Sequence, residues 1–378
     1  MNNKIRVIAD CHIPFLQGTI DNIATVTYLA ASEISNRTVK DADALLIRTR
    51  THCNESLLNS SKVKFIGTAT IGYDHIDTQY CLQKGIVWKN APGCNAASVA
   101  QYIVAALLYM ARKHSLSLTE STIGIIGVGH VGKQVAKMAE TLGMRVLLND
   151  PPRQEKEDLP HFVSIHEIAE KANFISYHTP YTNSGVYPTH HLFDQVYCKQ
   201  LKKKPIIINA ARGEIVDTTT LLNALHTRTI TDCVHDCWEN EPHISAPLAQ
   251  QAGIATPHIA GYSADGKATA TRMMITALTD YFGINIQKIN PFSIPLPIKS
   301  SIFATSNQMQ DALYELVSQT HPILQESCQL KNDVSAFEYL RNHYPIRREF
   351  FAYTVHVKKQ QLHVVPILQQ LGFNIQYT

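Results

Sequence analysis

The chain lacks several features that would assign it to a specialised class of protein. Its eight cysteines are scattered and none belongs to a Cys-x-x-Cys pair, so the sequence indicates neither a zinc finger nor a disulfide framework. We expect the cysteines to serve as small hydrophobic residues in a reducing compartment. No histidine pair shows metal-ligand spacing together with a second pair downstream, and no metal site is predicted.

Long apolar runs and a dominant sign of charge are missing too. The most apolar helical stretch, residues 99–110, is interrupted by Gln101 and is too short to span a bilayer. The apolar run near Met1 lacks the length and the cleavage pattern of a signal peptide. A formal net charge of +3 gives no indication of binding to nucleic acid or to a membrane. We therefore expect a cytoplasmic protein with neither kind of partner.

What is present is a globular composition and a repeated strand–helix pattern. With 45% hydrophobic residues over 378 positions, the chain can build two or three domain cores. Near-continuous apolar runs such as 205–208 are typical of parallel strands covered on both faces. The pattern predicts an α/β protein with two doubly wound parallel sheets, one of the flavodoxin-like type and one of the Rossmann type. The expected strands are residues 5–9, 44–47, 65–68, 86–88, 122–126, 145–148, 174–177, 206–209, 232–235 and 254–256.

Two long helices and a proline-rich segment suggest the domain boundaries. A helix over 95–113 is apolar on nearly all sides and should be buried, and a second is expected over 263–281. Residues 289–298 carry three prolines and resemble a linker. The expected domains are a substrate and catalytic domain (1–93 and 258–287), an NAD domain (94–257) and a small α+β C-terminal domain (288–378). The last is small for an independent core, so it should pack on another chain or on its own catalytic body.

A glycine-spaced motif predicts the cofactor site. Gly127, Gly129 and Gly132 follow a strand and begin a helix, where they would allow a tight turn, the approach of a pyrophosphate and close packing. Asp150 closes the next apolar run and would accept hydrogen bonds from the ribose, which favours NAD over NADP. Arg153 leaves open a contact with a 2′-phosphate, and a purely structural glycine turn is the other alternative.

Three distant side chains have complementary chemistry. Arg212 follows a predicted strand and can grip a carboxylate, while His258 can exchange a proton near neutral pH. Glu241 would orient the imidazole and stabilise its charged form. Asp236 ends a strand near the expected nicotinamide position. Taken singly, Arg212 could be a solvated strand-end arginine, Glu241 a solvated loop acid and His258 a structural histidine, which a lone histidine more often is.

Several stretches give the chain a family resemblance. They are residues 65–75, 91–96, 150–153, 177–180 and 258–262. In these stretches the chain resembles the D-isomer-specific 2-hydroxyacid dehydrogenases. The similarity continues through 347–349 and 371–374 of the tail, a region that generic members lack. One departure is Tyr73, where a small residue is usual, and it would alter the pocket wall.

The resemblance implies NAD-dependent oxidation of a phosphorylated 2-hydroxy acid by a homodimer joined through its C-terminal domain. Arg212, Glu241 and His258 would be the catalytic set, and Thr49, Thr70 and Tyr262 would contact substrate. The implied NAD contacts are Gly127, Gly129, His130, Val131, Gly132, Asp150, Thr179, Ala210, Ala211, Asp236 and Gly261.

A substrate phosphate needs cations. Arg48, together with Arg50, is the first candidate because both follow a strand, and Arg347 with Arg348 is the second. A solvated basic face is the alternative for both pairs. Two other functions stay open: a phosphoglycerate or glycerate dehydrogenase, and an NAD-sensing binding protein of the same fold.

Overall fold

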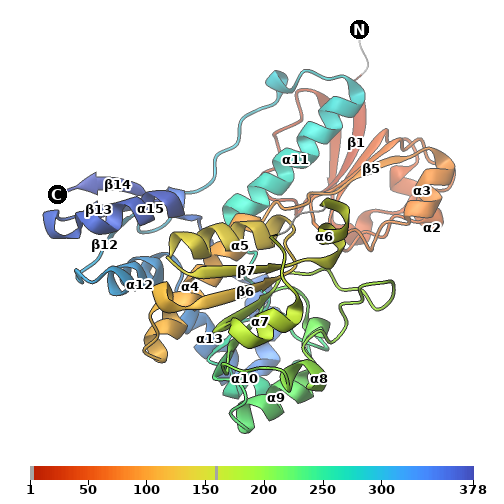
Figure 1. Ribbon diagram of the computed structural model, residues 1–378. Coiled ribbons are helices and arrows are strands. Elements are labelled where there is room, and N and C mark those ends of the chain that lie inside the picture. The colour runs from red at the N-terminus through yellow and green to blue at the C-terminus, as the bar shows by residue number, and fades with distance from the viewer. Residues whose placement is uncertain (1–3, 158–160) are drawn as a thin grey trace. The chain divides into compact units, whose positions relative to one another are not determined.

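The structure is a computed structural model that describes residues 4–157 and 161–378 (Figure 1). The chain divides into two compact units, each built from two segments. Unit 1 comprises residues 1–95 and 264–295, and unit 2 comprises 96–263 and 296–378. Residues 258–263 therefore belong to unit 2, and so does the tail that follows the proline-rich segment.

Unit 1 is a five-stranded parallel sheet with the strand order β2-β1-β3-β4-β5, which is the flavodoxin-like order. Helix α11 (Ala264–Phe282) packs its buried Met274 and Leu278 into the core that contains Phe65. The strands are β1 (Ile5–Asp10), β2 (Ala24–Leu29), β3 (Ala44–Ile47), β4 (Phe65–Thr68) and β5 (Val87–Lys89). The shorter helices are α1 (Asn36–Val39), α2 (Glu55–Leu58) and α3 (Thr78–Lys84).

Strand β2 was not among the predicted strands. It is an edge strand paired only with β1 among the described residues, and most of its side chains are partly or fully exposed. Because its burial is incomplete, its sequence Ala-Thr-Val-Thr-Tyr-Leu lacks the continuous apolar run that identified the central strands.

Unit 2 contains a six-stranded parallel sheet with the order β7-β6-β8-β9-β10-β11. Helices α4 and α5 contribute to the core on one face, and α7 to α10 contribute to the core on the other, as Figure 1 shows for α5 and α7. The strands are β6 (Thr122–Ile126), β7 (Arg145–Asn149), β8 (Phe174–Tyr177), β9 (Ile206–Asn209), β10 (Asp232–His235) and β11 (Ile254–Ala255).

The helices of this part of unit 2 confirm the doubly wound prediction. Helix α4 (Ala96–Lys113) is buried at nearly every position, as its all-round apolar sequence predicted. The others are α5 (His130–Thr141), α6 (Pro151–Glu157), α7 (Ile165–Lys171), α8 (Gln195–Cys198), α9 (Thr218–His226) and α10 (Ala246–Gln251).

The tail forms a three-stranded parallel sheet of its own, in the order β12-β13-β14. Its strands are β12 (Ser301–Phe303), β13 (Thr354–Val357) and β14 (Asn374–Tyr377). Its helices are α12 (Met309–Thr320), α13 (Ile323–Asn332), α14 (Phe337–Asn342) and α15 (Val365–Leu371). Apolar residues of α12 and α15 share one core with α4 and α5. Its independence as a third domain stays a prediction.

Candidate active site

The glycine motif forms a turn in which each glycine has a different reason to lack a side chain. Gly127 has a φ of +88°, and a Cβ there would lie 2.7 Å from the backbone of His178 and Thr179. A Cβ on Gly132 would lie 2.0 Å from the Gly127 carbonyl oxygen. A Cβ on Gly129, by contrast, would meet no described atom within 4 Å. The turn is therefore closed at two positions and open at the third, where a pyrophosphate can approach.

The start of α5 adds an anion-binding character to this turn. Helix α5 begins at His130, and its N-cap Gly129 provides no side-chain hydrogen bond to the first turn. Unpaired N–H groups at a helix N-terminus attract phosphate. Val131 is the next residue of the helix. Gly129, His130 and Val131 thus lie where the sequence motif predicted a pyrophosphate contact.

Asp150 and Arg153 bear on the choice between NAD and NADP. The Asp150 carboxylate accepts hydrogen bonds from the backbone N–H groups of Val128 (2.8 Å) and Arg153 (3.1 Å), which fixes it beside the glycine turn. The Arg153 guanidinium donates to Glu157 (Nε, 2.6 Å) and to the Val128 carbonyl (Nη1, 2.7 Å). Because Arg153 already pairs with the Glu157 carboxylate, its guanidinium is less available to bind the 2′-phosphate of NADP. This arrangement therefore supports NAD.

Unpartnered polar atoms lie next to the turn. The hydroxyl of Thr179 and Nδ1 of His178 are buried and have no hydrogen-bond partner among the described residues. Burial lowers the pKa of His178 to about 3, so this imidazole stays neutral. Buried polar groups are normally hydrogen-bonded. An unsatisfied Thr179 hydroxyl beside Gly127 therefore fits a site that a polar cofactor completes.

The predicted catalytic residues follow three neighbouring strands. Arg212 follows β9, Glu241 follows β10 and His258 follows β11, and these strands are adjacent and parallel. Their carboxyl ends meet at one edge of the sheet, where open α/β folds bind ligands. Nδ1 of His258 lies 2.8 and 3.0 Å from the two Glu241 oxygens. The structure thus places the carboxylate against the imidazole, as the sequence argument expected.

Asp236 holds the loop that carries His258. Its carboxylate accepts from the N–H groups of Ile259 (2.8 Å) and Ala260 (2.9 Å) and from the Thr256 hydroxyl (2.6 Å). Its carbonyl accepts from the N–H of His258, which has the unusual φ of +56°. Burial raises the pKa of Asp236. Sequence reasoning assigned this residue to NAD and missed its role in shaping the loop.

The charge of Glu241 is maintained by several neighbours. Burial acts to raise its pKa, but the hydrogen bond from His258, the backbone N–H of Trp238 (2.9 Å) and the charge of Arg341 bring the pKa below its usual value. The carboxylate is therefore ionised at neutral pH. An ionised partner on Nδ1 stabilises the positive imidazolium that forms when the other nitrogen accepts a proton.

Arg212 extends from a tightly packed turn. A Cβ on the following Gly213 would lie 2.0 Å from the Trp238 backbone, and the Asn209 side chain donates to the Arg212 carbonyl (2.9 Å). The guanidinium donates to the Ala211 carbonyl (2.7 Å), and the side chain is otherwise exposed. Ala210 and Ala211 lie between β9 and this arginine. The cation is thus held at the edge of the sheet with donors left for a carboxylate.

Arg341 is a charged neighbour that sequence reasoning missed. It lies on α14 of the tail, where its Nε donates to the Tyr262 hydroxyl (3.1 Å) and its Nη1 lies 3.9 Å from Glu241. Tyr262 and Gly261 follow His258 on the same loop. No motif in the tail indicated this arginine, because its position depends on tertiary packing alone.

The structure corrects the assignment of Arg347 as a candidate ligand of the substrate phosphate. This arginine was a second candidate for a phosphate ligand, but it is buried, and its guanidinium donates to His321 (2.9 Å) and to the Ala260 carbonyl (2.6 Å). Its neighbour Arg348 is buried as well. Arg347 instead supports the loop two residues beyond His258.

The remaining predicted residues lie at the carboxyl edge of the sheet in unit 1. The Arg48 guanidinium donates to the His12 carbonyl (3.3 Å), and Thr49 and Arg50 are exposed. The Thr70 hydroxyl donates to the Gly72 carbonyl (2.8 Å). The structure brings Arg48, Thr49 and Thr70 to one end of this sheet, after β3 and β4. The ring of Tyr73 packs against Trp88 in a tilted arrangement, with ring centroids 4.8 Å apart.

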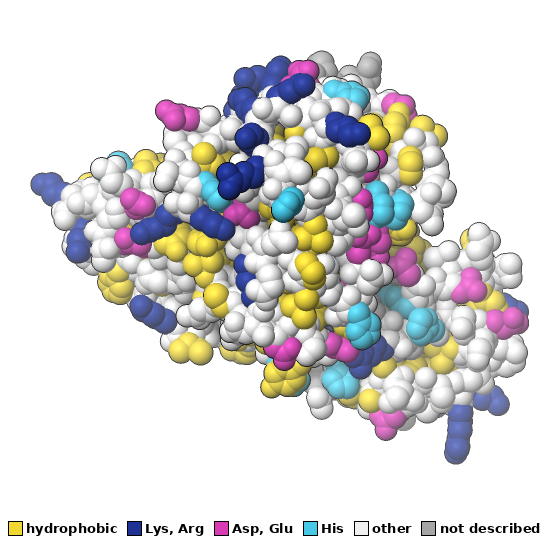
Figure 2. Space-filling model, turned by 90° about the horizontal axis from the view of Figure 1, so that it is seen from below, with side chains coloured by type: hydrophobic (Ala, Val, Ile, Leu, Met, Phe, Trp, Pro, Cys, Tyr) yellow, Lys and Arg dark blue, Asp and Glu magenta, His cyan; other side chains and the backbone are white. Residues whose placement is uncertain are grey.

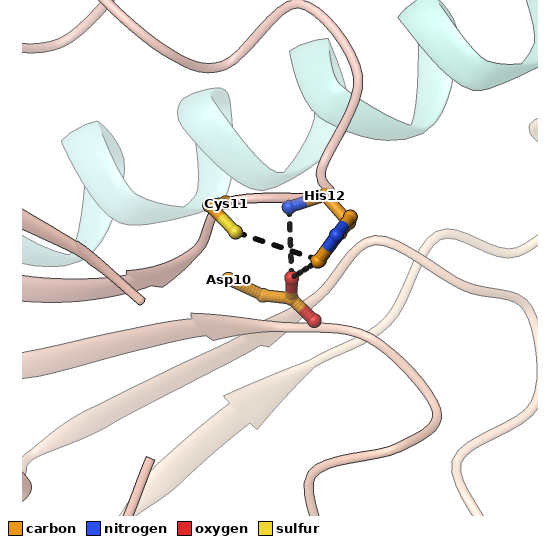
Figure 3. A group of neighbouring side chains, drawn as sticks. All are labelled: Asp10, Cys11 and His12. Atoms are coloured by element: carbon orange, nitrogen blue, oxygen red, sulfur yellow. Dashed lines mark hydrogen bonds and ion pairs between the residues drawn. The ribbon is translucent and has the colours of Figure 1, made fainter. Parts of the chain in front are cut away.

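A cluster of Asp10, Cys11 and His12 begins at the last residue of β1, at the same edge (Figure 3). The Asp10 carboxylate accepts from the His12 N–H (2.8 Å) and lies 3.2 Å from Nδ1 of its ring. These contacts form a local turn in which the polar groups satisfy one another.

The face of the molecule drawn in Figure 2 gives no single electrostatic signal. On the face of the described residues seen in Figure 2, basic, acidic and histidine side chains are interspersed with hydrophobic ones. Within the described ranges, no helix is both long and apolar enough to cross a membrane.

Comparisons with known proteins agree with this geometry. A model of the "D-isomer specific 2-hydroxyacid dehydrogenase, NAD binding domain" matches residues 98–260, and a "Domain of unknown function (DUF3410)" matches residues 294–372. An erythronate-4-phosphate dehydrogenase of Bacteroides thetaiotaomicron is 47% identical over 93% of this chain and 99% of its own. One from Escherichia coli O81 is 35% identical over 98% of both chains.

Solved structures resemble the body of the chain. The 3-phosphoglycerate dehydrogenase of Entamoeba histolytica with bound NAD has a TM-score of 0.61 at 26% identity, over 77% of this chain and 100% of that one. The D-lactate dehydrogenase of Aquifex aeolicus has a TM-score of 0.58 at 25% identity, over 75% of this chain and 97% of that one. Nearly the whole length of each neighbour therefore matches about three quarters of this chain. The full-length relatives show that the chain belongs to the D-isomer specific 2-hydroxyacid dehydrogenase family and, within it, to the group of the erythronate-4-phosphate dehydrogenases.

Proposed function

We propose that this protein oxidises 4-phospho-D-erythronate at C2 to 3-hydroxy-2-oxo-4-phosphobutanoate, with NAD as the cofactor, as a step of vitamin B6 (pyridoxal phosphate) synthesis. The observation that carries the proposal is the similarity of the whole chain, tail included, to relatives of that name. The His258–Glu241 pair beside the sheet edge supplies the matching chemistry.

The mechanism follows from three side chains. Arg212 holds the substrate carboxylate and polarises the oxygen that becomes the 2-oxo group. Neutral His258 accepts the proton of the C2 hydroxyl through its outer nitrogen, while Nδ1 stays bonded to Glu241. When bound, NAD supplies the acceptor for the hydride that leaves C2. In the reverse direction the imidazolium returns its proton to the oxygen.

The other predicted contacts keep their proposed roles. The glycine turn with His130 and Val131 would bind the pyrophosphate, Asp150 the ribose, and Thr179 the remainder of the cofactor. The other NAD contacts would come from Ala210, Ala211, Asp236 and Gly261. Arg48, Thr49, Thr70 and Tyr262 would bind substrate, since each lies at the carboxyl end of a strand in its own unit or on the loop after His258.

A homodimer is supported by the tail sheet. One face of this parallel sheet buries Ile302, Val355 and Val357, whereas Phe303 on the other face is 49% exposed and stacks on His356 with centroids 4.7 Å apart. Parallel sheets almost always have both faces covered. A second copy of the chain would cover the open face and bury Phe303.

The dimer is tested by placing a charge in that face. We expect Phe303→Asp to convert a dimer to a monomer in sedimentation, because a buried carboxylate without a partner is costly. Leu82→Asp, on an 80% exposed side chain of α3, is the matched control and should stay dimeric. A monomeric wild-type protein, or a dimeric Phe303→Asp, would contradict the assignment.

A substrate panel tests the activity. NADH formation is measured with 4-phospho-D-erythronate, 3-phosphoglycerate and D-glycerate under the same conditions. The proposal expects the highest kcat/KM with 4-phospho-D-erythronate. A preference for 3-phosphoglycerate would favour the phosphoglycerate dehydrogenases that the fold resembles. NAD binding without turnover of any hydroxy acid would indicate an NAD sensor.

A further inference from the structure

The tail brings a second cation to the residues that surround His258. Arg341 on α14 lies 3.9 Å from the Glu241 carboxylate and donates from Nε to the Tyr262 hydroxyl, at 3.1 Å. Its guanidinium carbon lies 5.8 Å from the centroid of the Tyr262 ring. These contacts fix the plane of the guanidinium within the group of proposed substrate and catalytic residues.

The geometry leaves donors of Arg341 available. A guanidinium has five N–H donors, and the Nε of Arg341 makes its single hydrogen bond among the described residues. The contact with Glu241 is too long for a hydrogen bond, and 34% of the side chain is exposed. The two terminal nitrogens are thus in place for a bidentate contact with an anionic group.

The substrate class supplies such a group. A 2-hydroxy acid that carries a phosphate has two anionic ends, and Arg212 is assigned to the carboxylate. We infer that Arg341, donated by the tail, binds the phosphate of the substrate and determines the preference for a phosphorylated 2-hydroxy acid. This inference rests on the proposed function, and it gives the tail a part in substrate recognition besides its part in assembly.

The test is a binding ratio that does not depend on turnover. Calorimetry in the presence of NADH gives the dissociation constants of 4-phospho-D-erythronate and D-erythronate for wild type and for Arg341→Gln. Loss of one charge-assisted bidentate contact should reduce the preference for the phosphorylated acid by about 10- to 100-fold. Arg341→Lys should restore part of it, because the charge is kept and the planar fork is lost.

A matched control exists within unit 2. Arg112 also lies over a tyrosine ring (Tyr314, 4.6 Å) and near a carboxylate (Asp311, 3.7 Å), so Arg112→Gln makes the same chemical change elsewhere and should keep the ratio. If Arg341→Gln weakens both acids equally, Arg341 only positions Tyr262 and Glu241, and the inference is wrong. Unchanged affinities for both acids would overturn it as well. A wild-type protein that prefers the phosphorylated acid but forms no NADH would refute the proposed function alone.

Discussion

Glu241 offers the sharpest perturbation of the proposed chemistry. In Glu241→Gln the amide oxygen can still accept from the Trp238 N–H, but a neutral amide replaces the carboxylate that pairs with His258 Nδ1. The charge-assisted bond to the imidazolium is lost, which costs about 1.5–3 kcal/mol or roughly 10- to 100-fold in rate. If the amide also turns its NH₂ group toward Nδ1, the imidazole is held in the wrong tautomer. The loss of kcat then approaches the ~10⁴-fold seen when a triad aspartate becomes asparagine in a serine protease.

The assay is steady-state NADH formation combined with calorimetry of NAD binding. We expect kcat to fall by these factors while the dissociation constant of NAD changes little, because Glu241 acts on the imidazole. Glu239→Gln is the control, since Glu239 lies two residues earlier and pairs with His191 at 2.7 Å. It should keep kcat close to the wild-type value. A Glu241→Gln enzyme with wild-type kcat would refute the assignment of this pair.

Two further predictions concern the glycine turn and the imidazole of His178 beside it. Gly129→Ala should fold normally and bind NAD more weakly. Gly132→Ala should also lower the melting temperature, because its Cβ would overlap the Gly127 carbonyl. Equal melting temperatures for the two variants would contradict the packing argument. Burial lowers the pKa of His178 to about 3 from 6.5, so the stability linked to its neutral form is complete above about pH 6.5 and is lost as the pH falls toward 3. The free energy of unfolding, measured with urea, should depend less on pH over this range in His178→Gln than in wild type, by a few kcal/mol at most. His166→Gln, at an exposed position, should keep the wild-type pH dependence. Parallel pH curves for His178→Gln and wild type would show that this histidine is not the cause.

The sequence predicted the central architecture because buried parallel strands have a simple signature. The runs that form β3, β4, β6, β8, β9 and β10 each contain consecutive apolar residues and are buried at every position, and their bounds were predicted to the residue. The edge strand β2 has no such signature. In the tail, residues 350–357 are rich in β-forming residue types, yet Phe350–Ala352 forms a 3-10 turn and β13 begins only at Thr354.

The candidate site was predictable where a local motif determines it. The glycine turn follows from a local motif, and the contact between Glu241 and His258 was expected from their complementary chemistry and from the family resemblance. The anchoring role of Asp236 and the place of Arg341 depend on contacts between segments that are 23 to 100 residues apart. Arg347 shows the opposite error, since a basic pair in the sequence suggested a surface ligand but the structure buries it.

The most direct test of the account is the rate of NADH formation by His258→Asn with 4-phospho-D-erythronate, measured beside wild type. General acid–base catalysis contributes about 10²- to 10⁴-fold, so we expect kcat to fall by that factor while NAD binds as before. A variant that keeps wild-type turnover would contradict the claim that this imidazole takes the proton from the substrate.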